Sequence, residues 1–331
     1  MRPLVFLEKM NEDSKLLAFQ FNRAFQSLSI VNDLNNSNAI FIKPNLTYPI
    51  YKKGVTTRKE FIESLISSLK EINSEIRIYI GEGEGGYNSF SINKAFMNMG
   101  YFELEKRFSK VKIVNLSKIP SREIEIATMQ GFYKILLPEI FFNEIDFSIS
   151  CPVPKVHCIT KVSLSYKNQW GCLPDVMRLK NHYMFDHIIS KISDLLKFKY
   201  AFLDGKYGLN GNGPIVGNCV EVNWFVASNS LGAFDVIVSE MMGFEWRKVG
   251  HLKMAAEYGF IPRREEIKVI GEIETLKRKY ILRRNIWNYL ALVAFHSKEI
   301  THLFYFSPIS RPLRKFMYSV RKGPIEFRQQ A

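Results

Sequence analysis

Long apolar runs, internal repeats and low-complexity tracts are absent from this sequence of 331 residues. No uncharged apolar run reaches the length of about 18 residues that marks a transmembrane helix, so we expect no membrane-spanning segment. The first residues, MRPLVFLEKMNEDSK, turn acidic after a short apolar stretch and lack the pattern of a secretory signal. We therefore expect a cytoplasmic location, with peripheral attachment to a membrane as an open alternative.

Cysteine is also scarce. Four cysteines stand at positions 151, 158, 172 and 219, and no two of them have CxxC spacing. This excludes the usual zinc-ribbon and ferredoxin patterns, so the chain has no iron–sulfur cluster motif. In a reducing compartment these thiols are expected to be buried and unpaired. The alternative is a scattered metal site that uses Cys151, Cys158 or Cys172 with a nearby histidine.

Acidic residues are rare near the C-terminus. From Lys277 onward the chain has twelve Lys and Arg but only two acidic residues, Glu299 and Glu326, so this segment carries +10 of the total net charge of +14. Such a segment attracts the phosphate groups of a lipid surface, a nucleic acid or a charged metabolite. It also mixes aromatic residues and leucines with arginines. That mixture predicts either an amphipathic helical extension packed on the body or an interfacial segment on an anionic membrane.

The rest of the chain alternates between strand and helix patterns. AIFIKPN, EIRIYIGEGEGG and VKIVNLS are typical of strands, and the stretch from Thr56 to Ile72 has apolar residues at helical spacing. This rhythm predicts an α/β fold with a mostly parallel sheet and helices on both faces. A weak boundary near residue 262 divides the chain into an α/β domain at 1–262 and a basic amphipathic helical extension at 263–331.

Polar residues follow several predicted strands, at the edge where open α/β sheets bind their ligands. Lys43 and Asn45 end the first strand and are candidates for binding an anionic or carbonyl group, with a solvated turn as the alternative. Glu82 lies in the glycine-rich turn after the next strand, which departs from the dinucleotide-binding pattern because two glutamates intrude. Its carboxylate suits a divalent metal ion or an acid–base role.

The densest polar stretch is PKVHCITKVSLSYKNQWG. In an extended segment residues two apart share a face, so Lys155 and His157 would project together. Along VSLSYKN the shared face would carry Ser163, Ser165 and Lys167. Neighbouring lysine and histidine lower each other's pKa towards neutrality, which makes Lys155, His157 and Lys167 candidates for acid–base catalysis. Asn168 is a candidate for binding a carboxylate or phosphate.

Further candidates lie downstream. On a helix, His182 would face the same way as Arg178 and Asp186, so Arg178 could bind substrate and Asp186 could orient the catalytic imidazole; a surface charge pair is the alternative. Asp204 ends the strand YAFLDG, where it could act as a base or a metal ligand. The glycine-rich loop that follows could form an amide nest for an anion, with candidate positions Gly205, Gly211 and Gly213.

The order of these motifs resembles a known family. IKPN, the pair TT before a helix, IGEGEGG, PKVHCITKVSLSYKNQWG, FLDGKYGLNGNGPIVG and ASNSLGAFD together resemble the family catalogued as domain of unknown function 362, over about residues 39–262. The sequence departs from the family where Val156 and Ser163 replace frequent threonines and Val153 replaces a frequent lysine. The resemblance implies an α/β domain that is an enzyme of unsettled reaction, of oxidoreductase or isomerase type.

Some relatives in that family carry ferredoxin-type iron–sulfur modules, which the cysteines of this chain do not supply. The central stretch is also distantly similar to the nickel-pincer lactate racemases, a likeness that by itself carries no function. No GxSxG, Walker A or HExxH motif is present, which argues against a standard hydrolase, P-loop kinase or metalloprotease.

Two functions follow from these observations. The first is an enzyme that acts on a small anionic carboxylate or phosphate metabolite, with Glu82 and Asp204 holding a divalent metal if one is used. It requires that the predicted catalytic side chains line one pocket. The second is a non-catalytic protein whose segment 277–331 binds an anionic membrane surface. Nucleic acid ranks lower as a partner because no RNA-binding motif is evident.

Overall fold

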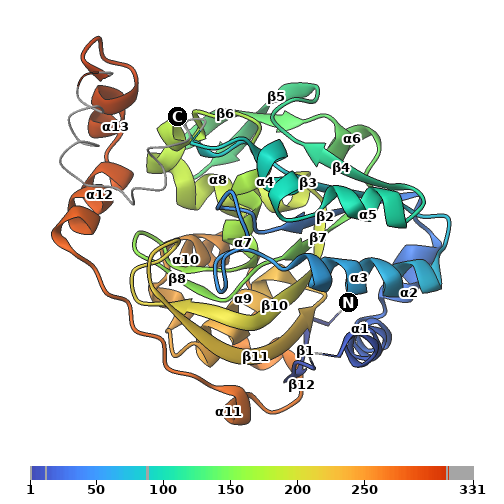
Figure 1. Ribbon diagram of the computed structural model, residues 1–331. Coiled ribbons are helices and arrows are strands. Elements are labelled where there is room, and N and C mark those ends of the chain that lie inside the picture. The colour runs from blue at the N-terminus through green and yellow to red at the C-terminus, as the bar shows by residue number, and fades with distance from the viewer. Residues whose placement is uncertain (1, 12, 87–88, 311, 313–331) are drawn as a thin grey trace.

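A ten-stranded sheet lies at the centre of the molecule in the computed structural model, which describes residues 2–11, 13–86, 89–310 and 312 (Figure 1). Eight strands form one continuous order: β12 (Lys268–Ile270), β1 (Leu4–Lys9), β11 (Asn218–Ser228), β10 (Phe198–Asn210), β7 (Phe147–Cys151), β2 (Ala39–Pro44), β3 (Arg77–Glu82) and β4 (Val111–Asn115). The short strands β8 (Lys155–His157) and β9 (Lys161–Ser163) extend the sheet from β10, and β5 (Ser121–Thr128) and β6 (Gly131–Pro138) form a separate hairpin.

Most strand pairs in the central sheet are parallel. The neighbours from β10 through β7, β2 and β3 to β4 all run in the same direction, whereas β11 pairs antiparallel with both β1 and β10. The carboxyl ends of β2, β3 and β7 therefore meet at one edge, where the sequence has its polar motifs. The prediction of a mostly parallel sheet is confirmed.

Helices cover both faces of the sheet, as predicted. One face carries α1 (Ser14–Leu28), α2 (Ile30–Asn35), α3 (Lys59–Ile72), α4 (Ile92–Asn98) and α5 (Phe102–Arg107). The other carries α6 (Ile140–Asn143), α7 (Ser165–Asn168), α8 (Phe185–Leu195), α9 (Leu231–Met241) and α10 (Gly250–Glu257). Short 3-10 helices lie at Gln169–Cys172, Arg178–Met184, Trp246–Lys248 and Arg264–Glu266.

Strand side chains alternate between two hydrophobic cores. In β2, Ile40 and Ile42 join the core beneath α1 to α5, while Phe41 joins the opposite core. This is the period of two that a strand buried on both faces shows. The predicted helical spacing in α3 is also confirmed, because its apolar residues lie on the buried side of the helix. Gly100, at φ +72°, separates α4 from α5.

Three local predictions are wrong. The segment VSLSYKN is not extended throughout: β9 ends at Ser163 and α7 begins at Ser165, because the buried Asp235 carboxylate accepts from the backbone N–H of Ser165 (2.8 Å) and Tyr166 (3.2 Å) and so caps a helical turn. Residues 178–184 form a 3-10 helix, so the four-residue spacing that would align His182 with its neighbours does not apply.

The third error concerns the glycine-rich loop expected after Asp204. β10 continues through it to Asn210, paired with β11 along this length apart from one irregularity after Gly205. A Cβ on Gly205 would lie 2.3 Å from the Trp224 carbonyl oxygen, so glycine here permits close pairing of two strands. Asp204 thus lies inside a strand, and no open loop begins at it.

The chain beyond residue 262 adds to the same sheet before it leaves the body. β12 pairs in parallel with β1, and α11 (Ile273–Leu276) leads into an extended segment that ends in α12 (Ile286–His296) and α13 (Lys298–Tyr305). Figure 1 shows these two helices, in orange and red, set beside the main body. The helical extension is confirmed as far as it is described; the basic residues at 311 and 314–328 lie outside the described residues.

Within the described part of the chain, no helix is both long and apolar enough to cross a membrane. The domain boundary at 262 stays a prediction, and β12 shows that residues on its far side complete the sheet edge.

Candidate active site

Lys43 and Glu82 form a buried ion pair where β2 and β3 end. The Lys43 ammonium donates to Glu82 Oε2 (2.5 Å) and to the Pro44 carbonyl (2.7 Å), and the backbone N–H of Leu46 also donates to Glu82 Oε2 (3.2 Å). Parallel strand ends bring these residues together although they are far apart in sequence. Both predicted site residues therefore lie at the predicted edge, but they bind each other.

Gly171 packs directly against this ion pair. A Cβ at position 171 would lie 1.8 Å from Glu82 Oε1 and 3.0 Å from the Lys43 ammonium, so no larger residue fits without displacing the carboxylate. The Gly171 carbonyl in addition accepts from the backbone N–H of Gly83 (2.7 Å). The glycine that ends the stretch PKVHCITKVSLSYKNQWG thus has a packing role.

Asp204 forms the second ion pair, with Arg58. The guanidinium donates to Asp204 Oδ1 through Nε (2.8 Å) and Nη2 (2.6 Å), and the backbone N–H of Arg58 donates to Oδ2 (2.7 Å). Sequence reasoning missed Arg58: it lies just after the TT pair, but 146 positions from Asp204, and no spacing rule links the two. We call Lys43–Glu82 and Arg58–Asp204 the strand-end ion pairs.

Neither carboxylate of the strand-end ion pairs is free to bind a metal in this structure, since each is held by a different cation. Among the residues that the structure describes, no three His, Cys, Asp or Glu side chains come together as a metal site would require. The divalent metal stays a prediction, and it would require Glu82 and Asp204 to leave Lys43 and Arg58.

Lys155 is fully buried and holds three neighbours together. Its ammonium donates to Asn45 Oδ1 (3.0 Å), Thr47 Oγ1 (3.0 Å) and the Val55 carbonyl (2.8 Å). Burial, and after it the charge of Lys167, holds the pKa of Lys155 well below its usual range. Three hydrogen bonds occupy all three donors of an ammonium, so Lys155 and Asn45 are here positioning residues.

Lys167 differs from the other lysines of the site because it has no such partners. Its amine makes no hydrogen bond or ion pair with another described residue and lies 5.0 Å from the centre of the Phe185 ring. Burial, and then the charge of Arg178, lowers the pKa of Lys167 to about 8. The helical turn α7, capped by Asp235, directs this side chain, so the same local structure that the sequence analysis missed positions the amine.

His157 lies at the end of β8 in a defined protonation state. Its Nδ1 accepts from the backbone N–H of Ile159 (3.1 Å) and Thr160 (3.3 Å), which leaves the proton on Nε2 in the neutral ring. Burial, and then the charge of Lys167, holds the pKa of His157 well below its usual range. This imidazole is therefore neutral at pH 7 and offers one N–H donor.

His182 packs among aromatic rings. Its ring centre lies 4.8 Å from that of Phe295, on α12, and 5.7 Å from that of Trp170. Burial, and then the charge of Lys167, lowers the pKa of His182 to about 3. Among the described residues, His182 makes ring contacts and no hydrogen bond to the Asp186 carboxylate, which was expected to orient it. The structure brings Lys167, His157 and His182 together with Arg178, and we call these four residues the Lys167 cluster.

Arg178 forms the side of the cluster towards β3. Its guanidinium donates to the Glu84 carbonyl through Nη2 (2.7 Å) and to the Asp175 carbonyl through Nη1 (3.4 Å), while Nε is buried without a partner in the described structure. Burial is the largest influence and lowers the pKa of Arg178. An arginine with a spare buried donor is well suited to bind an anion.

A cavity of about 590 Å³ opens beside the Lys167 cluster, within the size range of small-molecule sites. His157 and His182 line one part of it, and α12 and α13 supply most of the remaining wall. Arg284, just before α12, fixes this arrangement by donating to the Cys158 carbonyl (2.6 Å). Sequence reasoning did not place the extension at the site, because its composition resembles an independent tail.

The other predicted substrate-binding residues bind protein groups. Asn168 Nδ2 donates to the Lys43 carbonyl (2.9 Å) and to Ser150 Oγ (3.1 Å), which ties α7 to the strand ends. The Gly211 N–H donates to the Ile281 carbonyl (3.1 Å), and the Gly213 carbonyl accepts from the Cys158 N–H (2.9 Å). The amide nest proposed for these glycines stays a prediction that their observed contacts do not support.

His251, on α10, was not among the predicted site residues. It is fully buried, both ring nitrogens lack a hydrogen-bond partner in the described structure, and its ring centre lies 6.0 Å from that of Phe185. Burial, and then the charge of Lys167, lowers the pKa of His251 to about 3. Its neighbours in sequence are apolar and helical, which gives no signal of a buried polar site.

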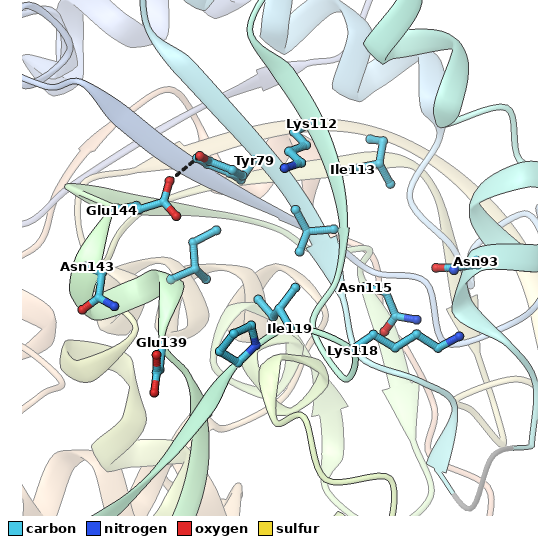
Figure 2. A pocket seen from close by; sticks show the side chains of 13 residues that line it. Tyr79, Asn93, Lys112, Ile113, Asn115, Lys118, Ile119, Glu139, Asn143 and Glu144 are labelled. Carbon is cyan, nitrogen blue, oxygen red and sulfur yellow. Dashed lines mark hydrogen bonds between the residues drawn. The ribbon is translucent and has the colours of Figure 1, made fainter.

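Another cavity, of about 510 Å³, lies beside β4 and α6 (Figure 2). Figure 2 shows polar side chains spaced around it, with the Tyr79 hydroxyl donating to the Glu144 carboxylate. None of the predicted site residues lines this cavity, and its acidic and basic side chains, among them Glu139 and Lys118, do not converge. The cavity at the Lys167 cluster is therefore the candidate active site.

Comparisons with known proteins add a family and a distant fold relationship. The sequence model of the family described as "Domain of unknown function (DUF362)" matches residues 40–240. The thylakoid-associated protein sll1697 of Synechocystis sp. is 23% identical over 244 residues, which are 71% of this chain and 73% of that protein.

Two solved structures are similar at lower identity. The lactate racemase apoprotein from Thermoanaerobacterium thermosaccharolyticum is 12% identical, with a TM-score of 0.47 over 72% of this chain and 57% of that one. A protein from Thermotoga maritima is 10% identical, with a TM-score of 0.33 over 61% of this chain and 54% of that one. This chain thus spans little more than half the length of either solved structure.

Proposed function

We propose that this chain, which belongs to the family Domain of unknown function (DUF362), is an enzyme that binds a small carboxylate and moves a proton on it. One observation carries the proposal: the amine of Lys167, on a partly buried side chain and without a hydrogen-bond partner among the described residues, lies in a cluster with His157 and His182 beside a cavity. A partly buried cation without a partner is unfavourable for folding, and strongly perturbed groups of this kind gather at functional sites.

The charges around Lys167 favour an anionic ligand. Arg178 is the charge that lowers the pKa of Lys167 most after burial, and the strand-end ion pairs already neutralise Glu82 and Asp204. A substrate carboxylate would supply the missing negative charge and would raise the pKa of Lys167 towards its ordinary value. It would also give the unused Nε donor of Arg178 an acceptor.

The protonation states support proton transfer. Before the carboxylate binds, a pKa of about 8 leaves a fraction of Lys167 as the neutral amine near neutral pH, and substrate that binds to this form meets a general base. In the proposed step the amine takes the proton from the carbon next to the substrate carboxylate, and the electron pair left on that carbon delocalises into the carboxylate. The Nε2–H of His157 and the guanidinium of Arg178 stabilise the added negative charge. Return of the proton from the Lys167 ammonium to the opposite face of the now planar carbon inverts that carbon and completes an isomerase-type reaction.

The test is exchange of substrate hydrogen with solvent. The protein is incubated in D2O with a panel of 2-hydroxy and 2-amino carboxylates, and loss of the C2–H signal is followed by proton NMR. We expect exchange of at least one compound, and a fall of about 100-fold or more in Lys167→Met, because a positioned base contributes about that much. Lys253→Met, at an exposed lysine, is the matched control and should exchange at the wild-type rate.

Equal exchange by wild type and Lys167→Met would remove Lys167 from the chemistry. Absence of exchange across the panel, together with no carboxylate binding by calorimetry, would overturn the proposed function itself.

A second candidate function is contact with an anionic membrane surface. Large apolar side chains are exposed on and after α12 and α13, with Ile286 66%, Tyr289 55% and Phe306 56% exposed, and the segment from Lys277 is strongly basic. Apolar side chains beside cations are the features by which interfacial helices bind anionic lipids. The Synechocystis relative is named as thylakoid-associated, which agrees with such a role.

Co-sedimentation with vesicles tests this candidate. Full-length protein is mixed with phosphatidylcholine vesicles that do or do not contain phosphatidylglycerol, and the variant Ile286→Ser/Tyr289→Ser/Phe306→Ser serves as comparison. We expect binding only to the anionic vesicles and a clear loss in the variant. If the variant binds as well as wild type, the exposed apolar residues have no part in it, and a salt-dependent DNA titration then decides whether the basic segment prefers nucleic acid.

A further inference from the structure

The cavity beside the Lys167 cluster has two chemically different ends. His157 and His182 form the polar end, next to Lys167. The opposite wall comes from the inner side of α12 and α13 and is mainly apolar. A site that needed only to hold a small, fully polar anion would have no use for this second part, because apolar walls give no hydrogen bonds to such a ligand.

The apolar wall is built from consecutive turns of the two helices. Trp287, Ala294 and Ile300 line the cavity from this side, and Phe304 follows one turn further along α13. Two polar residues of the wall make hydrogen bonds within the helices: Asn288 Oδ1 accepts from the backbone N–H of Asn285 (3.0 Å) and Thr301 Oγ1 donates to the Ala294 carbonyl (3.1 Å). Most of the other residues of this wall are apolar.

Helix α12 contacts the polar end of the cavity directly. Phe295 of α12 packs against the His182 ring at 4.8 Å between ring centres, and against Phe185 at 5.4 Å. Phe185 in turn lies beneath the Lys167 amine. The wall that α12 supplies therefore directly adjoins the polar end of the cavity.

We infer that the substrate is an amphiphile, a carboxylate with an unbranched hydrocarbon tail, whose head lies at His157 and His182 and whose tail lies along α12 and α13. This inference rests on the proposed function, because it takes the Lys167 cluster as the site of the carboxylate. It adds the tail and assigns the C-terminal helices to substrate selection. The polarity fits, since two imidazoles near the charges of Lys167 and Arg178 line one end and apolar side chains line the other.

The experiment is a binding series with straight-chain carboxylates from butanoate to decanoate, each used below its micelle-forming concentration. Affinity for full-length protein is measured by calorimetry. We expect the affinity to rise by about fourfold for each added methylene, which corresponds to about 0.8 kcal/mol, until the tail fills the cavity. Ala294→Trp should abolish this dependence on length while leaving butanoate binding within about twofold of wild type.

Matched variants separate the inference from the proposed function. Tyr289→Trp adds the same ring on the exposed side of the same helix and should keep the full dependence on length. Lys167→Met should weaken every member of the series by a similar factor, because it removes the cation near the head. A length dependence that survives Ala294→Trp, or no length dependence in wild type, would overturn the amphiphilic substrate.

The opposite result, a length dependence with no effect of Lys167→Met, would keep the tail site and overturn the proposed anion site. A parallel titration with phosphatidylglycerol vesicles distinguishes a single amphiphile in the cavity from adsorption to a bilayer. Ala294→Trp should weaken the first and leave the second unchanged; weakening of vesicle binding alone would count against a tail site in the cavity.

Discussion

The strand-end ion pairs and the Lys167 cluster use the same kinds of residue in opposite ways. In the first group, Lys43 and Arg58 each donate to a buried carboxylate at short distance. In the second, the Lys167 amine has no carboxylate and no hydrogen bond in the described structure. The difference shows that partners, rather than residue type or burial, separate a structural cation from one that is available for chemistry.

The comparison also explains where folding free energy is gained and where it is lost. Each strand-end ion pair connects strands or helices that are far apart in sequence, so removing one member leaves an uncompensated buried charge. Removing Lys167 leaves no charge behind. The same substitution, lysine to methionine, should therefore lower the free energy of unfolding at Lys43 and raise it at Lys167.

The largest effect is expected for Lys43→Met. This variant leaves the Glu82 carboxylate, 5% exposed, without its cation and should lower the free energy of unfolding by about 3–5 kcal/mol. Guanidinium denaturation at pH 7 measures the change, and the exposed Lys253→Met should stay within about 0.5 kcal/mol of wild type. A loss in Lys43→Met as small as in that control would refute the structural role of the pair.

The next largest effect is expected at Gly171, which packs against the Lys43–Glu82 pair. Gly171→Ala introduces a Cβ 1.8 Å from Glu82 Oε1 and should destabilise the fold by about 1–3 kcal/mol, because the carboxylate must move away from Lys43. In the Lys43→Met background the Glu82 carboxylate is no longer held in place, so Gly171→Ala should lower the free energy of unfolding by a smaller amount. Additive losses in the double variant would show that Gly171 and the ion pair act independently.

The smallest effect, and the one of opposite sign, is expected for Lys167→Met. The pKa of Lys167 is about 8 in the folded protein against 10.5 for an ordinary lysine, so the unfolded chain binds more protons between these values. Wild-type stability should therefore rise as the pH increases from 8 to 10.5. Below pH 8 the folded protein bears the full free-energy cost of a charged Lys167. Denaturation curves across this range should show that rise in wild type and less of it in the variant.

At pH 7 Lys167→Met should accordingly be more stable than wild type by about 1–2 kcal/mol, part of the penalty being relieved by residual solvent around the amine. A variant that loses stability at pH 7 would mean that Lys167 has a structural partner and belongs with the strand-end ion pairs.

The sequence was informative where one local rule governs the structure. The apolar spacing of α3 follows from a single helical period and is confirmed, and the strand predicted for AIFIKPN is found as β2. The meeting of Lys43 and Glu82 also followed from sequence, because parallel strands end at a common edge. What could not follow was that the two bind each other.

The errors arose where distant contacts override local pattern. The glycines after Asp204 are typical of a loop, but pairing with β11 keeps the segment in a strand. Asp235 turns the chain at Ser165 into a helix from 70 positions away. Arg58 and Phe295 reach the site in the same way, and no periodicity within their own segments indicates the residues they contact.

Titration of Lys167 by NMR tests the central claim most directly. Protein labelled with ¹³C at the lysine side-chain carbon next to the amine is followed from pH 6 to 11, and the resonance absent from Lys167→Met gives the assignment. The account predicts a midpoint near pH 8 that moves upward when decanoate is added. A midpoint near 10.5 that does not respond to decanoate would contradict it.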